Sequence, residues 1–129
     1  MTHTTNYRDT FTSVAPDCPA TVAEVPPERA TPSVARLQYE MLVDAPYRYT
    51  SDDVVHRTQG ERRGIDRDTF FSTGQACLRA SPLVKRYGWG LHHDAEGRVA
   101  LVPVESPEYA ALRADPSLQQ NAGMRSARA

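Results

Sequence analysis

The sequence predicts a single α+β domain in which a small, mainly antiparallel sheet packs against several short helices. Three observations favour this class. The chain has 129 residues, the usual length of one domain. A hairpin pattern occupies residues 89–104, and apolar side chains recur at helical spacing within residues 32–43. We place the domain at residues 1–114 and expect the polar, small-residue-rich segment 115–129 to be disordered.

A strand and a helix are the first elements expected along the chain. Residues 7–15 carry β-branched and aromatic side chains with partial alternation, which is typical of a strand. The helix is predicted over residues 32–43 because its apolar side chains form one stripe: Val34, Leu37, Met41 and Leu42. Thr31 is the expected N-cap, and Pro46 explains why the helix ends near residue 44.

A second helix is predicted from a capping-box pattern. Thr50 is followed three residues later by Asp53, so the threonine hydroxyl and the carboxylate can satisfy each other's backbone amides. Both carboxylates of the Asp52-Asp53 pair then serve the helix N-terminus, where negative charge is favourable. The helix should run to about Gln59, and GERRG at 60–64 is expected to be an exposed loop.

Short elements follow. Residues 66–73 should form one or two turns that bury two phenylalanines and end at Gly74 in the left-handed conformation. Residues 76–80 are expected to be extended. Ser81, followed by proline, is predicted to cap one helical turn that ends at Gly88.

The hairpin is the clearest β signal in the sequence. Strands at 89–93 and 98–104 flank a DAEG turn in which Gly97 should be left-handed. Beyond the hairpin, Ser106 repeats the Ser-Pro cap signal and predicts a last helix.

The hairpin register distributes side chains over two faces. Trp89, Leu91 and His93 share one face, and Gly90 and His92 share the other. Glycine in a strand often marks a close approach, so the second face has either a shallow slot beside His92 or a helix packed tightly on it. Since the adjacent histidines point to opposite faces, they cannot chelate one metal together, and we predict no metal and no cofactor.

The segment that precedes and enters the hairpin predicts binding of a small anionic ligand or partner group. Backbone amides at a short helix N-terminus and nearby cations suit a phosphate or carboxylate. The candidate binding residues are Arg79, Ser81, Lys85, Arg86, Tyr87 and His92. Arg79 and Lys85 would supply charge, and Tyr87 a stacking wall. In the alternative interpretation Ser81 only caps the helix, and the cations only complement its dipole.

Two other functions stay open at this point. Cys77 and His92 are candidates for a nucleophile and base in a small enzyme, with Arg79 favouring the thiolate. A buried, inert cysteine is the alternative. The third hypothesis is a protein-interaction module that docks a partner through the hairpin edge strand near Val102 or through the apolar face of the hairpin.

Charge and composition argue against further classes. Fifteen Lys+Arg and sixteen Asp+Glu give a net charge of -1, so no basic field attracts nucleic acid. No run approaches the roughly 20 apolar residues needed to cross a bilayer. The polar first ten residues lack a signal-peptide core, and two cysteines are too few for a disulfide framework, so we expect a cytoplasmic protein.

Three phrases carry a resemblance to a known family. They are TTNYRDTFTSVAPDCP at 4–19, LQYEMLVDAPYRYTSDDVV at 37–55 and FFSTGQACLRASPLVKRYGWGLHHDAEGRVALVPVESPEY at 70–109. Over about residues 4–110 the chain resembles an uncharacterised family of short bacterial proteins, a domain of unknown function. The resemblance implies one compact domain of this size and supplies no activity, cofactor or catalytic residue.

Overall fold

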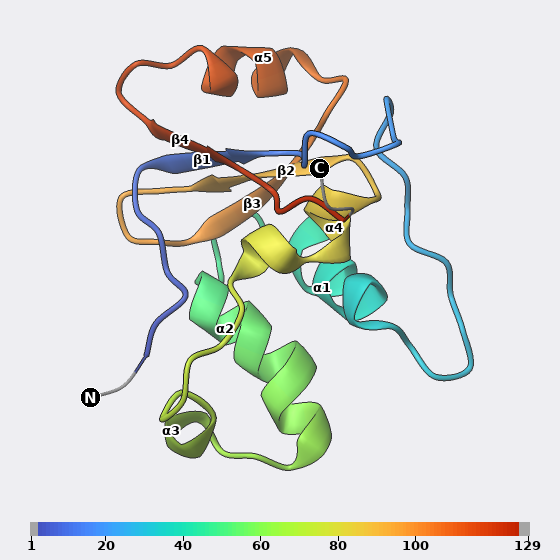
Figure 1. The fold of residues 1–129 in the computed structure, drawn as a ribbon, viewed down its shortest axis with the longest axis vertical. Coiled ribbons are helices and arrows are strands. Elements are labelled where there is room, and N and C mark those ends of the chain that lie inside the picture. The colour runs from blue at the N-terminus through green and yellow to red at the C-terminus, as the bar shows by residue number, and fades with distance from the viewer. Residues whose placement is uncertain (1–2, 127–129) are drawn as a thin grey trace.

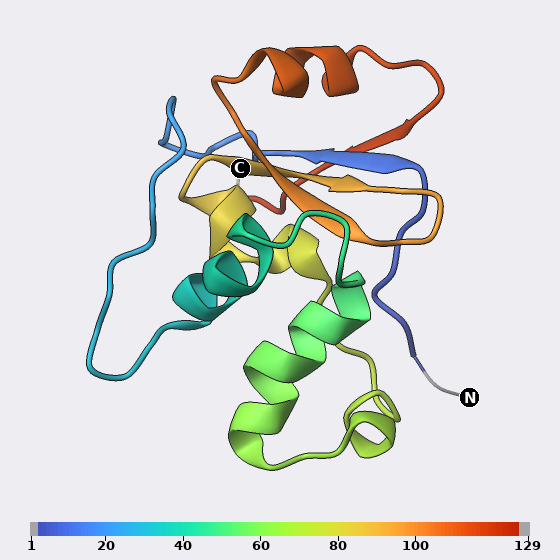
Figure 2. The ribbon, with the colours of Figure 1, turned by 180° about the vertical axis from the view of Figure 1, so that it is seen from behind.

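The structure, a computed structural model, describes residues 3–126 and has the α+β architecture predicted from the sequence. A four-stranded sheet in the order β3-β2-β1-β4 forms the middle layer. Figures 1 and 2 show α5 on one face of this sheet and α1, α2 and α4 on the other. The strands are β1 (Thr10–Ser13), β2 (Trp89–His93), β3 (Val99–Pro103) and β4 (Gln119–Ala122).

The helical elements are short. The α-helices are α1 (Val34–Val43), α2 (Ser51–Val55), α3 (Arg67–Phe70), α4 (Pro82–Lys85) and α5 (Pro107–Arg113). A π-helical turn, η1 (His56–Gly60), and two 3-10 turns, η2 (Glu61–Arg63) and η3 (Leu78–Ala80), complete the set. Within the described residues no helix combines the length and the apolar character that crossing a membrane requires.

The sheet is mixed. The pairings of β1 with β2 and of β2 with β3 are antiparallel, as predicted, but β4 pairs parallel to β1. The segment 115–129, for which the sequence predicts disorder, therefore contains a strand, while residues 127–129 lie outside the described residues. Polar β4 pairs through its backbone, with Gln119 N donating to Asp9 O at 2.8 Å. Its sequence lacks the alternation of apolar and polar residues that predicts a strand.

The hairpin has the predicted register. Its pairs include His93 with Val99, Leu91 with Leu101 and Trp89 with Pro103. Gly97 has a φ of 80°, so the turn uses the left-handed conformation that glycine allows. These local predictions are confirmed.

Helix caps agree with the sequence in part. The capping box of Thr50 and Asp53 is present, with the two reciprocal hydrogen bonds at 3.2 and 3.0 Å. The cap of α1 is Ser33 rather than Thr31, because the Ser33 hydroxyl accepts a hydrogen bond from Arg36 N at 3.1 Å. The helix ends at Asp44 as expected.

The predicted loop at 60–64 is wrong. After α2 the chain continues as the π turn η1 and the 3-10 turn η2, and it ends at Gly64, whose φ is 68°. Thr58 helps to hold the π turn, since its hydroxyl donates to Val54 O at 2.8 Å. Gly60 makes room for His56, whose ring would lie 2.5 Å from a Cβ at position 60.

Two smaller predictions between the helices also fail. Gly74 has no positive φ, and α3 ends at Phe71 instead. Residues 78–80, expected to be extended, form the turn η3, in which Ser81 N bonds to Leu78 O at 2.9 Å.

The core has two parts, one on each face of the sheet. On one face, buried side chains of the sheet, α1, α2 and α3 pack together, among them Leu42, Val54 and Leu91. On the other face Tyr109 of α5 packs on Phe11 and Val102. A Cβ at Gly90 would lie 2.8 Å from the Tyr109 ring, so α5 closes the slot considered beside His92. Trp89, which shares the first face, is only half-buried, and its indole donates to Glu24 O at 2.8 Å.

Candidate functional site

The residues of the predicted anion site have partners elsewhere in the structure. Arg79 Nε donates to Ala122 O, at the last residue of strand β4, at 2.6 Å. Ser81 Oγ donates to the buried Gln38 Oε1 at 2.5 Å and accepts from Leu83 N at 3.2 Å. Ser81 is thus the cap of α4, as predicted, and it is 95% shielded from solvent, with a relative exposure of 5%.

The remaining residues of that prediction are also dispersed. The Arg86 guanidinium lies 5.4 Å from the ring centre of Tyr87, and Lys85 has no ion pair within the described residues. His92 Nδ1 forms a hydrogen bond of 2.7 Å with the Tyr47 hydroxyl. Arg79, Arg86 and His92 thus contact three different partners, Ala122, Tyr87 and Tyr47.

The pair considered for catalysis is likewise not formed. Cys77 Sγ lies 3.5 Å from the hydroxyl of Tyr7, whereas His92 is bonded to Tyr47. His93 is the histidine that faces Tyr7, with ring centres 5.5 Å apart. Burial lowers the pKa of His93 to about 4, and its Nδ1 has no hydrogen-bond partner in the part of the chain that the structure describes.

The edge of the hairpin is partly covered. Tyr47 N donates to Val99 O at 3.0 Å, and Val99 N donates to Tyr49 O at 2.9 Å. Val102, expected near a docking edge, is 2% exposed beneath α5. The apolar side of the strand is thus part of the core.

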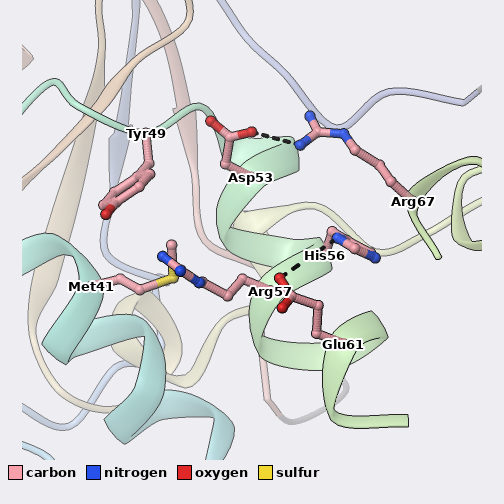
Figure 3. Close-up of a pocket in the computed structure, with 7 residues that line it drawn as sticks. All are labelled: Met41, Tyr49, Asp53, His56, Arg57, Glu61 and Arg67. Atoms are coloured by element: carbon pink, nitrogen blue, oxygen red, sulfur yellow. Dashed lines mark hydrogen bonds and ion pairs between the residues drawn. The ribbon is translucent and has the colours of Figure 1, made fainter. Parts of the chain in front are cut away.

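A cleft of about 280 Å³ lies between α1 and the continuous helical segment formed by α2 and η1. Figure 3 shows the side chains around it. Its charged groups are largely paired with one another. Arg67 Nη1 lies 2.7 Å from Asp53 Oδ1, and His56 Nδ1 lies 4.0 Å from Glu61 Oε2. Arg57 has its guanidinium 5.9 Å from the ring centre of Tyr49. Because the opposite charges neutralise each other, this cleft is a weak candidate for binding an ion.

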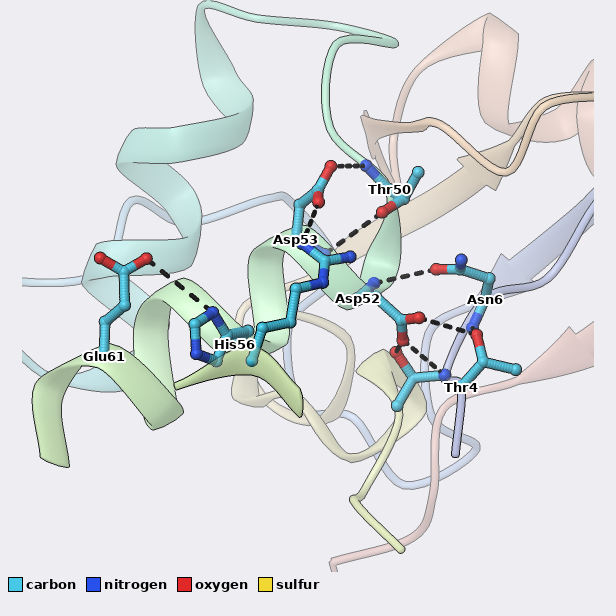
Figure 4. Close-up of polar contacts among 9 residues, drawn as sticks. Thr4, Asn6, Thr50, Asp52, Asp53, His56 and Glu61 are labelled. Atoms are coloured by element: carbon cyan, nitrogen blue, oxygen red, sulfur yellow. Dashed lines mark hydrogen bonds and ion pairs between the residues drawn. The ribbon is translucent and has the colours of Figure 1, made fainter. Parts of the chain in front are cut away.

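The acidic start of α2 is also accounted for by internal contacts, which Figure 4 shows. Asp52 accepts hydrogen bonds from Thr4 Oγ1 at 2.8 Å and from Thr5 N at 2.6 Å. Burial would raise the pKa of Asp53, but hydrogen bonds from Arg67 and Thr50 outweigh it and lower that pKa. Across residues 3–126 no three His, Cys, Asp or Glu side chains are placed to hold a metal ion.

A larger hollow, of about 430 Å³, has unpaired cations instead. It is lined by Val34, Thr58, Gln59, Arg62 and Arg63, and we call it the arginine hollow. Among residues 3–126, no carboxylate lines it. Neither Arg62 nor Arg63 has an ion pair within the described part of the chain, and the Gln59 amide has no hydrogen bond there.

Local structure explains how these side chains meet. Thr58 and Gln59 belong to the π turn η1, an element that is frequent at functional sites. Arg62 and Arg63 belong to η2 directly after it. Sequence analysis missed this site because it treated 60–64 as a loop. The available signal was the spacing, since positions three and four after Gln59 share its side of a continuous helix.

A second, smaller hollow of about 180 Å³ adjoins the first. Val34 and Gln59 line both. Its other walls include Gln38, Cys77, Ala80 and Ser81, and we call it the inner hollow. Among the predicted residues, it is therefore Cys77 and Ser81 that the structure brings to one cavity.

Comparison with known proteins identifies the family of the chain but no activity or ligand. No curated protein and no solved structure matches the chain. The family of unknown function DUF6157 matches residues 2–129, nearly the whole sequence. This confirms the resemblance to an uncharacterised family, while bacterial origin stays a prediction. The chain therefore belongs to the family of unknown function DUF6157.

Proposed function

We propose that the protein is a noncatalytic binding protein for a small anionic molecule, and that the arginine hollow receives the anion. One observation carries the proposal: two arginines line a hollow of about 430 Å³, and no carboxylate of the described residues lines it. Ligand sites commonly have volumes of about 300–1,000 Å³. The hollow has the size of such a site and an excess of positive charge.

The chemistry of the lining residues favours an oxyanion. A guanidinium has five N–H donors in a planar arrangement that matches carboxylate or phosphate oxygens. Arg62 and Arg63 are both exposed, and neither forms an ion pair with a carboxylate of residues 3–126. The Gln59 amide offers an uncharged donor beside them. A charge-assisted hydrogen bond is stronger than a neutral one, so these groups favour an anion over a neutral molecule.

The same walls argue for binding rather than catalysis. The arginine hollow has no histidine, cysteine or carboxylate in its lining, so it lacks a group for general acid–base work. The Thr58 hydroxyl is engaged with Val54 O at 2.8 Å. We place the protein in the cytoplasm, where its two free thiols, Cys18 and Cys77, would stay reduced.

The test is to titrate the protein with inorganic phosphate and with succinate. Isothermal titration calorimetry measures the affinities, and amide chemical shifts locate the site. The Arg62→Ala/Arg63→Ala variant should bind both anions at least about tenfold more weakly, since a hydrogen bond to a charged group contributes about 1.5–3 kcal/mol. The control is Arg8→Ala/Arg113→Ala, which removes two other exposed arginines and the same charge. The control should bind as the unchanged protein does.

Two results would overturn the proposal. One is equal anion affinity in both double variants, which would reduce binding to a general charge effect. The other is the absence of any shift at amides 58–63 when the unchanged protein is titrated.

A further inference from the structure

We infer that the anion site continues into the inner hollow, so that its ligand has an anionic head and a neutral body. The inference rests on the proposed function, because the head is held by Arg62 and Arg63. It adds the chemical class of the ligand: an organic phosphate or carboxylate whose uncharged part is short and compact.

The two hollows share a wall. Val34, at the start of α1, and Gln59, in η1, line both of them. A ligand atom that leaves the two arginines along this wall passes the Gln59 amide and enters the inner hollow. The amide is half-buried and unbonded within the described residues, so it can bond to a ligand at the junction.

The inner hollow is built for an uncharged group. No cation and no carboxylate lines it, and Val34, Ala80 and Pro82 give it apolar surface. Its buried polar groups already satisfy each other: Ser81 Oγ bonds to Gln38 Oε1 at 2.5 Å, and Gln38 Nε2 bonds to Thr58 Oγ1 at 3.4 Å. A second ionised group would lose its hydration there without gaining a partner.

Volume limits the size of the body. The inner hollow measures about 180 Å³. At about 30 Å³ for each water-sized group, it holds about six such groups. A four-carbon chain fits this space, whereas a large ring system does not.

Cys77 supplies a reporter inside this hollow. Its thiol is in no disulfide and is half-buried, 3.5 Å from the Tyr7 hydroxyl, and the residue lines the inner hollow. A body that occupies the inner hollow should shield Cys77 from an alkylating reagent. An anion bound only at Arg62 and Arg63 should leave the alkylation rate unchanged.

The experiment compares inorganic phosphate with n-butyl phosphate in the Cys18→Ser background, where Cys77 is the single thiol. Calorimetry gives the two affinities, and mass spectrometry follows alkylation of Cys77 by iodoacetamide. We expect n-butyl phosphate to bind about tenfold more tightly than phosphate, since its butyl chain leaves water when it enters the inner hollow, and only part of this gain is lost on ordering. We also expect n-butyl phosphate, but not inorganic phosphate, to slow the alkylation of Cys77. At a concentration that occupies most of the protein, the rate should fall by at least about threefold.

A matched pair of variants tests the location of the body. Ala76→Leu places a larger side chain at the rim of the inner hollow, and Ala110→Leu makes the same change on α5; both positions are exposed. Ala76→Leu should remove the advantage of n-butyl phosphate and keep phosphate binding, and Ala110→Leu should change neither.

The outcomes separate the two proposals. If both probes bind with equal affinity and Cys77 is alkylated at the same rate with either probe, the two-part site is wrong, although the anion site stands. If neither probe binds, the proposed function fails as well. If n-butyl phosphate binds more tightly but Ala76→Leu and the Cys77 rate are unaffected, the body lies elsewhere and the inference is again overturned.

Discussion

The Tyr109 ring lies directly against Gly90, and its hydroxyl accepts a hydrogen bond from Val14 N at 2.9 Å. One side chain of α5 thus contacts β2 through its ring and the end of β1 through its oxygen. A Cβ at position 90 would come within 2.9 Å of the Phe11 ring as well. The missing side chain in β2 is therefore what allows α5 to approach the sheet.

Gly90→Ala should lower the free energy of unfolding by about 1–3 kcal/mol, the usual cost of forcing extra volume into a packed core. Urea unfolding measures the loss. Gly74→Ala is the control, because a Cβ there meets nothing within 4 Å and Gly74 lacks a positive φ. Its effect should be neutral or stabilising by about 0.4–1 kcal/mol. Equal destabilisation by both changes would contradict the close approach.

His93 should make the protein sensitive to acid. Burial lowers the pKa of His93 to about 4, against an ordinary value of 6.5. As the pH falls from about 6.5 to 4, the unfolded chain takes up a proton that the folded chain refuses, so stability decreases. The loss approaches roughly 3 kcal/mol at the lower end of this window.

The matching measurement is urea unfolding of His93→Phe at pH 7, 5.5 and 4.5. Phenylalanine keeps an aromatic ring beside Tyr7 and removes both the titration and the unpaired Nδ1. The variant should lose less stability between pH 7 and 4.5 than the unchanged protein. His3→Ala, at an exposed histidine, should keep the original pH dependence. Parallel pH curves for His93→Phe and the unchanged protein would refute the assignment.

Asp52 should be the main attachment of the N-terminal segment. Its carboxylate accepts hydrogen bonds from Thr4 Oγ1, Thr5 N and Thr5 Oγ1, at 2.6–2.8 Å. Asp52→Ala leaves the buried Thr5 amide without its acceptor and should cost about 2–3 kcal/mol. Hydrogen exchange should also show faster exchange of the Thr5 amide. Asp68→Ala, at an exposed carboxylate, should change stability by less than about 0.5 kcal/mol.

Two serine caps should differ in strength. Ser81 is buried and bonds to Leu83 N and to buried Gln38, whereas Ser106 is half-buried and bonds to Tyr109 N and Pro103 O. Ser106→Ala should cost about 1 kcal/mol, the ordinary value of a cap. Ser81→Ala should cost about 2–3 kcal/mol, because it also leaves Gln38 Oε1 unpaired. Thermal unfolding of the two variants compares them, and a smaller loss for Ser81→Ala would show that Gln38 finds another donor.

Sequence reasoning succeeded where the determinants are local. The hairpin depends on its turn glycine, and the cap of α4 depends on Ser81 followed by proline. The capping box of Thr50 works over three residues. The two caps are side chains that bond to backbone two or three positions away, and the turn depends on the φ of one glycine. A short sequence pattern therefore specifies each of these structures.

It failed where contacts join distant segments. Arg79 is expected from the sequence to bind a ligand, but its guanidinium donates to the carbonyl of Ala122, 43 positions later in the sequence. No local pattern around Arg79 indicates this partner. The arginine hollow requires Val34 to lie beside η1, and this depends on how α1 packs. The polar strand β4 shows the same problem, since its pairing with β1 is a backbone interaction that leaves no pattern in its side chains.

The parallel pairing of β4 with β1 has a practical consequence for shortened forms of the protein. A chain cut at residue 114 would keep helices α1 to α5 and strands β1 to β3, but β1 would lose β4, its neighbour at the edge of the sheet. The freed row of amides and carbonyls is a template on which a second copy can add its own strand. Trimming the tail should thus make the protein more prone to self-associate and precipitate.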